Sequence, residues 1–189
     1  MEKLDARKRY TQMVLKQSFL ELLKEKPVSR ITVKEVCALA QLNRATFYAH
    51  YSDCFALMES IENELIDAFE KSLRYVNSFD VTALIEAIYD MVNQNQAVCR
   101  VLILENTNST VLMRMIALAK DDSIAYWRKE PPNASETDLE MMYTHLPNGM
   151  MHIVVEGYDK YSKDEIIRFV SRVVKASLSL FQSPQRPLA

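Results

Sequence analysis

Residues 31–51, ITVKEVCALAQLNRATFYAHY, decide how the first part of the chain folds, because they encode two short helices joined by a turn. Thr32 and Glu35 have the spacing of a capping box, and small or apolar residues then recur along one face of the helix that it starts. The pattern breaks after that helix, and Asn43 is a favourable N-cap for a second helix over about 44–51. These lengths are typical of a helix-turn-helix unit.

Helical periodicity extends in both directions from this stretch. An amphipathic helix is predicted over about 5–25, where Pro27 stops it, and Ser52 or Asp53 can cap a fourth helix that reaches about residue 73. The pattern predicts further helices over about 81–95, 97–105, 109–128, 136–157 and 163–181, with a loop at 130–137. Pro147 predicts a kink or a break near 143–149.

The composition supports an all-α fold. The chain has 189 residues but only two glycines, which disfavours all-β folds built on tight turns. We therefore predict a three-helix helix-turn-helix domain at 1–51, an all-helical regulatory and dimerisation domain at 52–182, and a disordered tail at 183–189.

Charge is distributed unevenly along the chain. Residues 1–52 hold ten Lys or Arg and five Asp or Glu, a net charge of +5, whereas the remainder has a net charge of −7. A basic first domain on an acidic body indicates that the first domain alone meets a polyanion. The spacing of the helix-turn-helix makes double-stranded DNA the expected partner.

The second helix of such a unit reads the major groove with its exposed side chains. Arg44 is long enough to bond a guanine edge, Thr46 can bond a base or a phosphate, and Ala45 allows close approach. Tyr48 and His50 suit phosphate oxygens, while helix N-termini attract phosphate through their dipoles. The predicted DNA-binding residues are Thr32, Lys34, Asn43, Arg44, Ala45, Thr46, Tyr48, His50 and Tyr51.

The same run resembles the signature of the TetR/AcrR family of bacterial transcriptional regulators, in particular Thr-Phe-Tyr-x-His-Tyr at 46–51 after the capping segment at 31–36. The resemblance covers roughly residues 8–60. It implies a homodimeric regulator, most simply a repressor, that binds DNA and responds to a small-molecule effector held in an all-helical body.

Two positions depart from the family pattern. Gln41 stands where members usually have glycine in the turn, and a non-glycine residue there needs another geometry or carries strain. Cys54 stands where many members have a phosphate-binding lysine, so one phosphate contact is lost. These departures keep a second interpretation open, a TetR-like coregulator that binds a protein partner and has lost DNA binding.

The resemblance also implies an effector pocket and a dimer interface in the body. Methionine-rich and aromatic positions suit an adaptable pocket, and the candidates are Met91, Cys99, Met113, Tyr126, Trp127, Met142, His145 and Met150. The helices at about 136–157 and 163–181 have the most regular apolar faces and predict a four-helix interface across a two-fold axis. Its predicted residues are Leu139, Tyr143, Leu146, Ile153, Phe169, Val173, Ser177 and Leu180.

Other function classes find little support in the sequence. Neither a nucleophile elbow nor a phosphate-binding glycine loop occurs, so no enzyme and no cofactor is predicted, and Cys54 near His50 is a weak candidate nucleophile pair. His145 and His152 lack a third ligand at zinc-like spacing. Three scattered cysteines, a charged start and no long apolar run predict a cytoplasmic protein with no membrane contact.

Overall fold

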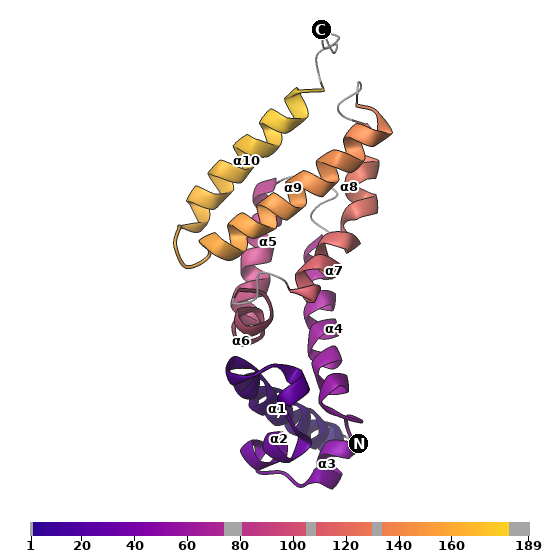
Figure 1. Cartoon of the computed structure of the whole chain (residues 1–189), viewed down its shortest axis with the longest axis vertical. Coiled ribbons are helices and arrows are strands. Elements are labelled where there is room, and N and C mark those ends of the chain that lie inside the picture. Colours follow the sequence, from indigo (N-terminus) through magenta and orange to yellow (C-terminus); the bar gives the residue numbers. More distant parts are fainter. Residues whose placement is uncertain (1, 74–80, 105–108, 130–133, 182–189) are drawn as a thin grey trace. The chain divides into compact units, whose positions relative to one another are not determined.

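The computed structural model describes residues 2–73, 81–104, 109–129 and 134–181, and every regular element in these ranges is a helix (Figure 1). The predicted all-α fold class is confirmed. The chain divides into a head unit, Met1–Leu65 with Ala97–Val101, and a body unit, Ile66–Gln96 with Leu102–Ala189. The division falls within helix α4 (Cys54–Leu73), further along the chain than the boundary predicted after residue 51.

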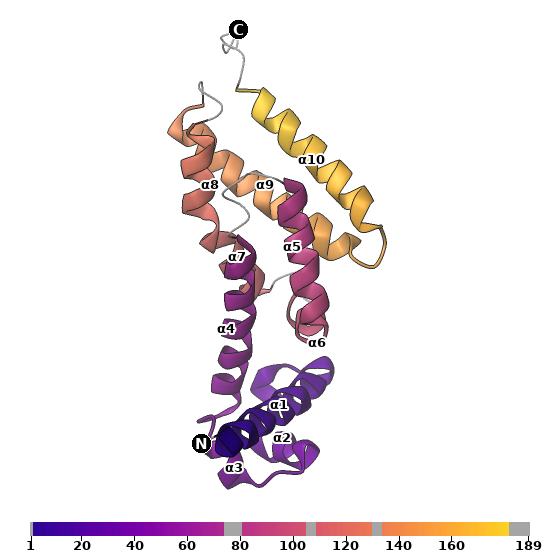
Figure 2. The same ribbon diagram turned by 180° about the vertical axis from the view of Figure 1, so that it is seen from behind.

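The head unit is built around the helix-turn-helix. Helix α1 (Glu2–Glu25) packs against α2 (Val33–Ala40), and α2 packs against α3 (Arg44–Tyr48), as Figure 2 shows. A short 3-10 turn at Val28–Arg30 links α1 to α2. The head core contains the fully buried side chains of Leu15, Phe19, Val36, Phe47 and Leu57. This burial fixes the faces of α2 and α3 that remain outside.

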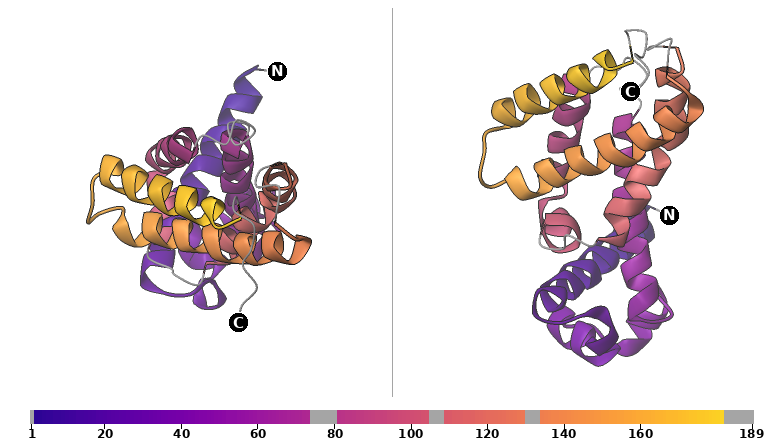
Figure 3. Two further views of the ribbon diagram at one scale, coloured as in Figure 1. Left: turned by 90° about the horizontal axis from the view of Figure 1, so that it is seen from above. Right: turned by 45° about the horizontal axis from the view of Figure 1, so that its top comes forward.

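The body unit is a helical bundle. Its helices are α5 (Val81–Gln94), α7 (Thr110–Leu118), α8 (Lys120–Trp127), α9 (Glu136–Gly157) and α10 (Lys163–Ser179). Helices α9 and α10 run antiparallel and side by side in each view (Figures 1 and 3), while α5 packs on α10 and α8 on α9. Helix α6 (Gln96–Cys99) and a π-helical turn at Arg100–Leu104 follow α5.

Helix α9 ends at a glycine, Gly157, that lies close to side chains of the connection and of α10. A Cβ atom at Gly157 would lie 3.0 Å from Ile166 Cδ1 and 3.0 Å from Tyr161 Cδ2. Any larger residue would have to push these side chains aside. The capping box predicted at Ser162 and Glu165 is present and starts α10 directly after this contact.

Two predicted boundaries were wrong, one at Ala119 and one at the end of α3. The helix predicted over 109–128 is divided at Ala119 into α7 and α8. Near Pro147 a kink or a break was predicted, and the break is absent because α9 continues through Pro147. Helix α3 ends at Tyr48 instead of about residue 51. The predicted tail at 183–189 and most of the predicted loop at 130–137 lie outside the described residues.

Among the described residues, no helix combines the length and the apolar character that a membrane crossing requires.

Candidate functional site

The turn between α2 and α3 keeps the geometry that glycine normally provides. Gln41 has φ 55° and ψ 39°, in the left-handed region, and its N–H donates to the Ala38 carbonyl at 3.3 Å. The Leu42 N–H donates to the Cys37 carbonyl at 2.9 Å. These two bonds form a Schellman motif, in which a left-handed residue ends the helix. From the sequence, Gln41 was expected either to adopt another turn geometry or to carry backbone strain. The structure shows the second alternative, because Gln41 is in the left-handed region.

Replacing Gln41 with glycine is expected to stabilise the head. A side chain in the left-handed region costs roughly 1–2 kcal/mol, and part of this gain is offset by the greater freedom of glycine in the unfolded chain, so we expect about 0.5–1 kcal/mol. Urea unfolding followed by circular dichroism measures it. Gln17→Gly, an exposed position inside α1, should instead destabilise, and a loss of stability in Gln41→Gly would contradict the strain.

Helix α3 presents a small, polar surface to solvent. Arg44, Ala45 and Tyr48 are exposed, and Thr46 is half-buried, while Phe47 is fully buried between them. The Phe47 ring meets the Tyr48 ring edge-on, with their centroids 5.7 Å apart. Phe47 thus anchors a short helix whose outward residues are largely those predicted from the sequence.

Two of the predicted DNA-binding residues, Asn43 and Thr46, are hydrogen-bonded to each other at the start of α3. Asn43 Oδ1 accepts from the Thr46 N–H at 2.7 Å and from the Thr46 hydroxyl at 2.8 Å. The predicted N-cap is confirmed. The Thr46 hydroxyl proton is used in the bond to Asn43, so this side chain offers an acceptor and a methyl group to a partner, which suits an amino group or a thymine better than a phosphate.

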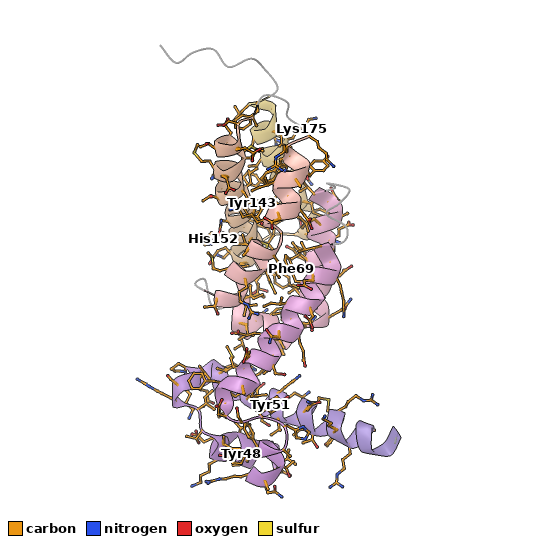
Figure 4. The ribbon with its side chains drawn as sticks, turned by 90° about the vertical axis from the view of Figure 1, so that its right-hand side faces the viewer. Tyr48, Tyr51, Phe69, Tyr143, His152 and Lys175 are labelled. Carbon is orange, nitrogen blue, oxygen red and sulfur yellow. The ribbon has the colours of Figure 1, made fainter. Side chains whose placement is uncertain are left out.

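Tyr51, which was named among the DNA-binding residues, packs inward with Phe47, as their spacing of four residues indicates. Its side chain is only 7% exposed, and its ring lies 5.9 Å from that of Phe47, inside the head. Figure 4 labels Tyr48 on α3 and Tyr51 beyond its end. The reason is helical spacing: Tyr51 follows Phe47 by four residues, its N–H bonds the Phe47 carbonyl at 2.9 Å, and its ring therefore lies on the same buried side. His50 stays half-buried at the edge of this surface.

The carboxylate of Glu35 accepts hydrogen bonds at the start of α2. The Thr32 N–H and hydroxyl donate to Glu35 Oε2 at 2.9 and 2.7 Å, and the Glu35 N–H donates to the Thr32 hydroxyl at 3.3 Å. Lys26 Nζ donates to Glu35 Oε1 at 2.5 Å. The capping box is confirmed, but the Thr32 donors predicted to bind phosphate are used within the head. Lys34 remains exposed beside them.

This network makes the stability of the head dependent on acid. Hydrogen bonds from Lys26 and Thr32 lower the Glu35 pKa from 4.5 to about 2. A lowered pKa stabilises the folded state above about pH 4.5, and this contribution is lost as pH falls from 4.5 towards 2. Urea midpoints at pH 6, 4 and 3 should therefore decline less in Glu35→Gln than in the unchanged chain. Equal declines would contradict the role of this carboxyl.

Cys54 does not have the properties of a phosphate ligand or a nucleophile. It is buried at the first turn of α4, and burial with nearby Asp53 raises its pKa. A reactive cysteine needs a lowered pKa and access to solvent. Asp53, one of the two predicted caps, is the residue that caps α4, since its Oδ1 accepts from the Ala56 N–H at 2.8 Å.

Two exposed cations of the head were not among the predicted DNA-binding residues. Arg7 and Lys8 lie on the first turns of α1 with their side chains in solvent. Together with Lys34 and Arg44 they add positive charge to the same unit. The signal was present in the run Arg7-Lys8-Arg9, but periodicity analysis treats such a run only as the solvent side of a helix.

The body unit contains a partly open apolar cavity of about 90 Å³, lined by residues of α4, α5, α7, α8, α9 and α10. Phe69 and Tyr143, labelled in Figure 4, are on its wall. Of the eight predicted pocket residues, Trp127 and Met150 line it. The other six do not line this cavity: Met91, Met142 and Cys99 are buried elsewhere, Tyr126 is half-buried, and Met113 and His145 are exposed.

The cavity-lining residues that the sequence analysis missed are mostly aliphatic side chains. They include Leu84, Ile88, Met115 and Met151, which the periodicity assigns to an ordinary helix core. A cavity is a failure of neighbouring helices to fill space completely, and a linear pattern carries no signal for it.

The predicted dimer residues separate into two groups. Leu139, Tyr143 and Leu146 were wrongly assigned, since all three are buried in the core of their own subunit, where Tyr143 donates to the Ile116 carbonyl. Phe169 on α10 is exposed by 55%, and Leu180, directly after the end of α10, by 71%. Half-buried positions complete the set: Ile153, Val173 and Ser177.

An apolar groove lies beside the exposed residues of α10. It has a volume of about 400 Å³ and is lined by Ile153, Tyr161, Glu165, Ile166 and Phe169. The groove and the exposed aromatic ring form one continuous surface of α9 and α10. A face of this kind on a surface helix is unusual unless something covers it.

The two histidines of α9 stand on either side of Pro147 and Gly149 within one helix. Because α9 is continuous, His145 and His152 lie two turns apart on one exposed face. Across the described part of the chain, no group of three or more His, Cys, Asp or Glu side chains is placed to hold a metal ion.

Comparison with known proteins gives a fold and a short sequence match. No family model matches the chain. An uncharacterised HTH-type transcriptional regulator of Bacillus subtilis (strain 168), YxbF, is 30% identical over 59 residues, which is 31% of this chain and only 16% of that protein.

Solved structures match nearly the whole chain. A TetR transcriptional regulator from Streptococcus agalactiae 2603V has a TM-score of 0.66 at 22% identity, covering 92% of this chain and 98% of that one. A transcriptional regulator (TerR/AcrR family) from Aquifex aeolicus VF5 has a TM-score of 0.60 at 17% identity, covering 88% and 98%. The chain therefore has the fold of the TetR/AcrR-family transcriptional regulators.

Proposed function

We propose that this chain is a DNA-binding transcriptional regulator that acts in the cytoplasm as a homodimeric, ligand-responsive repressor. The observation that carries the proposal is the orientation of α3, where buried Phe47 holds Arg44, Ala45 and Tyr48 on the outer surface of the head. A helix of this kind fits the major groove with its first residues at the base edges. Arg44 bonds a guanine, and Tyr48 and Lys34 contact phosphates.

Replacing Arg44 with alanine is expected to relax base preference at one position of the operator, at a cost of about 1–3 kcal/mol for the preferred base. Binding to a set of single-substituted operators measures the change. Lys34→Ala is the matched control, because loss of a phosphate contact should weaken binding evenly across all sequences and flatten the salt dependence. An unchanged ranking of operators in Arg44→Ala would remove Arg44 from base recognition.

The ligand response is assigned to the cavity in the body. Phe69 and Leu73 of α4 contribute to the cavity wall, and Leu57 and Ile61, earlier on the same helix, belong to the head core. A ligand that favours one position of the end of α4 shifts the population of head arrangements that fit two half-sites. A difference of about 2–3 kcal/mol between the two states changes operator affinity about 30–150-fold.

A second candidate function is a coregulator that binds a protein partner instead of DNA. The observation in its favour is that the donors of Thr32 and Thr46 are used within the head and that Cys54 is buried. The purified chain is therefore titrated with its own upstream DNA at 50 and 200 mM salt. Specific binding that weakens steeply with salt supports the repressor, and no retention at 50 mM supports the coregulator.

A further inference from the structure

The cavity in the body unit has an uncharged lining. None of its wall residues is an Asp, Glu, Lys, Arg or His. The polar side-chain groups of the wall are the hydroxyls of Ser123 and Tyr143 and the indole N–H of Trp127. The Tyr143 hydroxyl already donates to the Ile116 carbonyl, which leaves a ligand few groups with which to form hydrogen bonds.

We propose that this cavity binds a small, uncharged, apolar molecule of about one substituted aromatic ring and rejects carboxylates and ammonium ions. The inference deepens the ligand response proposed above and depends on it only for the regulatory meaning of the binding. It names the class of the effector from the chemistry of the wall.

The size of the cavity sets the size of the ligand. Its volume is about 90 Å³, of the same order as the roughly 150 Å³ apolar cavity that admits benzene in an engineered protein. Three methionines, Met115, Met150 and Met151, line the wall. Their flexible thioethers can rearrange to admit ring substituents.

The composition of the wall sets the charge of the ligand. Phe69, Trp127 and Tyr143 provide aromatic surfaces, and aliphatic side chains provide most of the rest, so an apolar ring leaves water for a favourable environment. A carboxylate or an ammonium group would lose its hydration and find no opposite charge. Burial of an unpaired charge is strongly unfavourable.

Trp127 gives a direct readout. It is the single tryptophan of the chain and lies on the wall, so its fluorescence reports occupancy without a label. The full chain is titrated with toluene, benzoate and benzylamine, three probes of similar size that differ in charge. We expect a saturable emission change with toluene and at least about 100-fold weaker binding of both charged probes.

Two alanines provide a matched pair of variants. Ala119 lines the cavity, and Ala117 is exposed on α7 two positions earlier. Ala119→Leu should fill the cavity and abolish the toluene response, while Ala117→Leu should retain it. If Ala119→Leu fails to fold by circular dichroism, Val81→Phe at the half-buried start of α5 fills the same cavity from another helix.

Three outcomes overturn the proposal. No saturable response to toluene would make the cavity a packing gap, benzoate binding within tenfold of toluene would refute the class, and an undiminished response in a folded cavity-filled variant would place the binding elsewhere. The experiment contains no DNA, so these failures are distinct from a failure of the proposed repressor function. If the chain binds toluene but no operator, the proposed ligand class of the cavity stands and the proposed repressor function is contradicted.

Discussion

Phe47→Ala is expected to lower the free energy of unfolding of the head by about 3–5 kcal/mol, the usual cost of deleting a fully buried aromatic ring. Phe47 is 0% exposed and lies 5.9 Å from the ring of Tyr51. Its removal takes away the anchor of α3, a helix of only five residues whose own hydrogen bonds are too few to hold it. The surface that presents Arg44 and Tyr48 should be lost with it.

Phe55 provides the matched control for this prediction. It belongs to the same unit but is 59% exposed, so Phe55→Ala should change stability by no more than about 0.5 kcal/mol. Hydrogen exchange of head amides measures both variants, because Trp127 fluorescence reports on the body instead. Comparable protection in the two variants would show that Phe47 does not hold the head together.

Local signals in the sequence predicted the helix ends well. The capping boxes at Thr32 and Ser162, the stop at Pro27 and the cap at Asn43 are all where they were predicted. Each depends on hydrogen bonds between residues at most a few positions apart, so the sequence nearby contains the whole cause. The left-handed geometry of Gln41 also depends on local hydrogen bonds, but the sequence left it open between another turn geometry and strain.

Features that depend on packing between helices were predicted poorly. Nothing in the local sequence signals the division at Ala119, because good helix formers flank it on both sides. Pro147 signals a break that α9 does not have, because its packing outweighs the loss of one backbone hydrogen bond. The sequence correctly predicted a regular apolar face on α9. Its residues Leu139 and Leu146 are buried in the core of the body unit instead of being available to a dimer interface.

The candidate surface of the head lies between these two cases. Periodicity correctly turned Phe47 inward and Arg44 outward, since both depend on helical geometry alone. It also turned Tyr51 inward, four residues after Phe47, and the burial of both rings agrees with this, although Tyr51 was also named among the DNA-binding residues. The cavity is lined by residues of six helices, so its position depends on how all six pack. The sequence pattern indicated only that methionines suit an adaptable pocket.

The exposed face of α10 carries the second large expected effect. A homodimer of the proposed kind must cover this face, and Phe169 is the large hydrophobic side chain that α10 exposes there. Phe169 borders the groove that also contains Glu165. Buried aromatic anchors of this kind dominate the energetics of protein interfaces.

Phe169→Glu is therefore expected to weaken the dimer at least about 100-fold, because it removes the anchor and places a second carboxylate beside Glu165 in the interface. Analytical ultracentrifugation measures the dissociation constant, and circular dichroism should show an intact subunit because Phe169 adds little to its own core. Met113→Glu, at a 60% exposed position of α7, is the control and should remain dimeric. Operator affinity should fall with the dimer, since a monomer reaches one half-site only. If the dissociation constant of Phe169→Glu were unchanged, α10 would not form the interface. The proposed arrangement, in which two α3 helices of one dimer bind one operator, would then be contradicted as well.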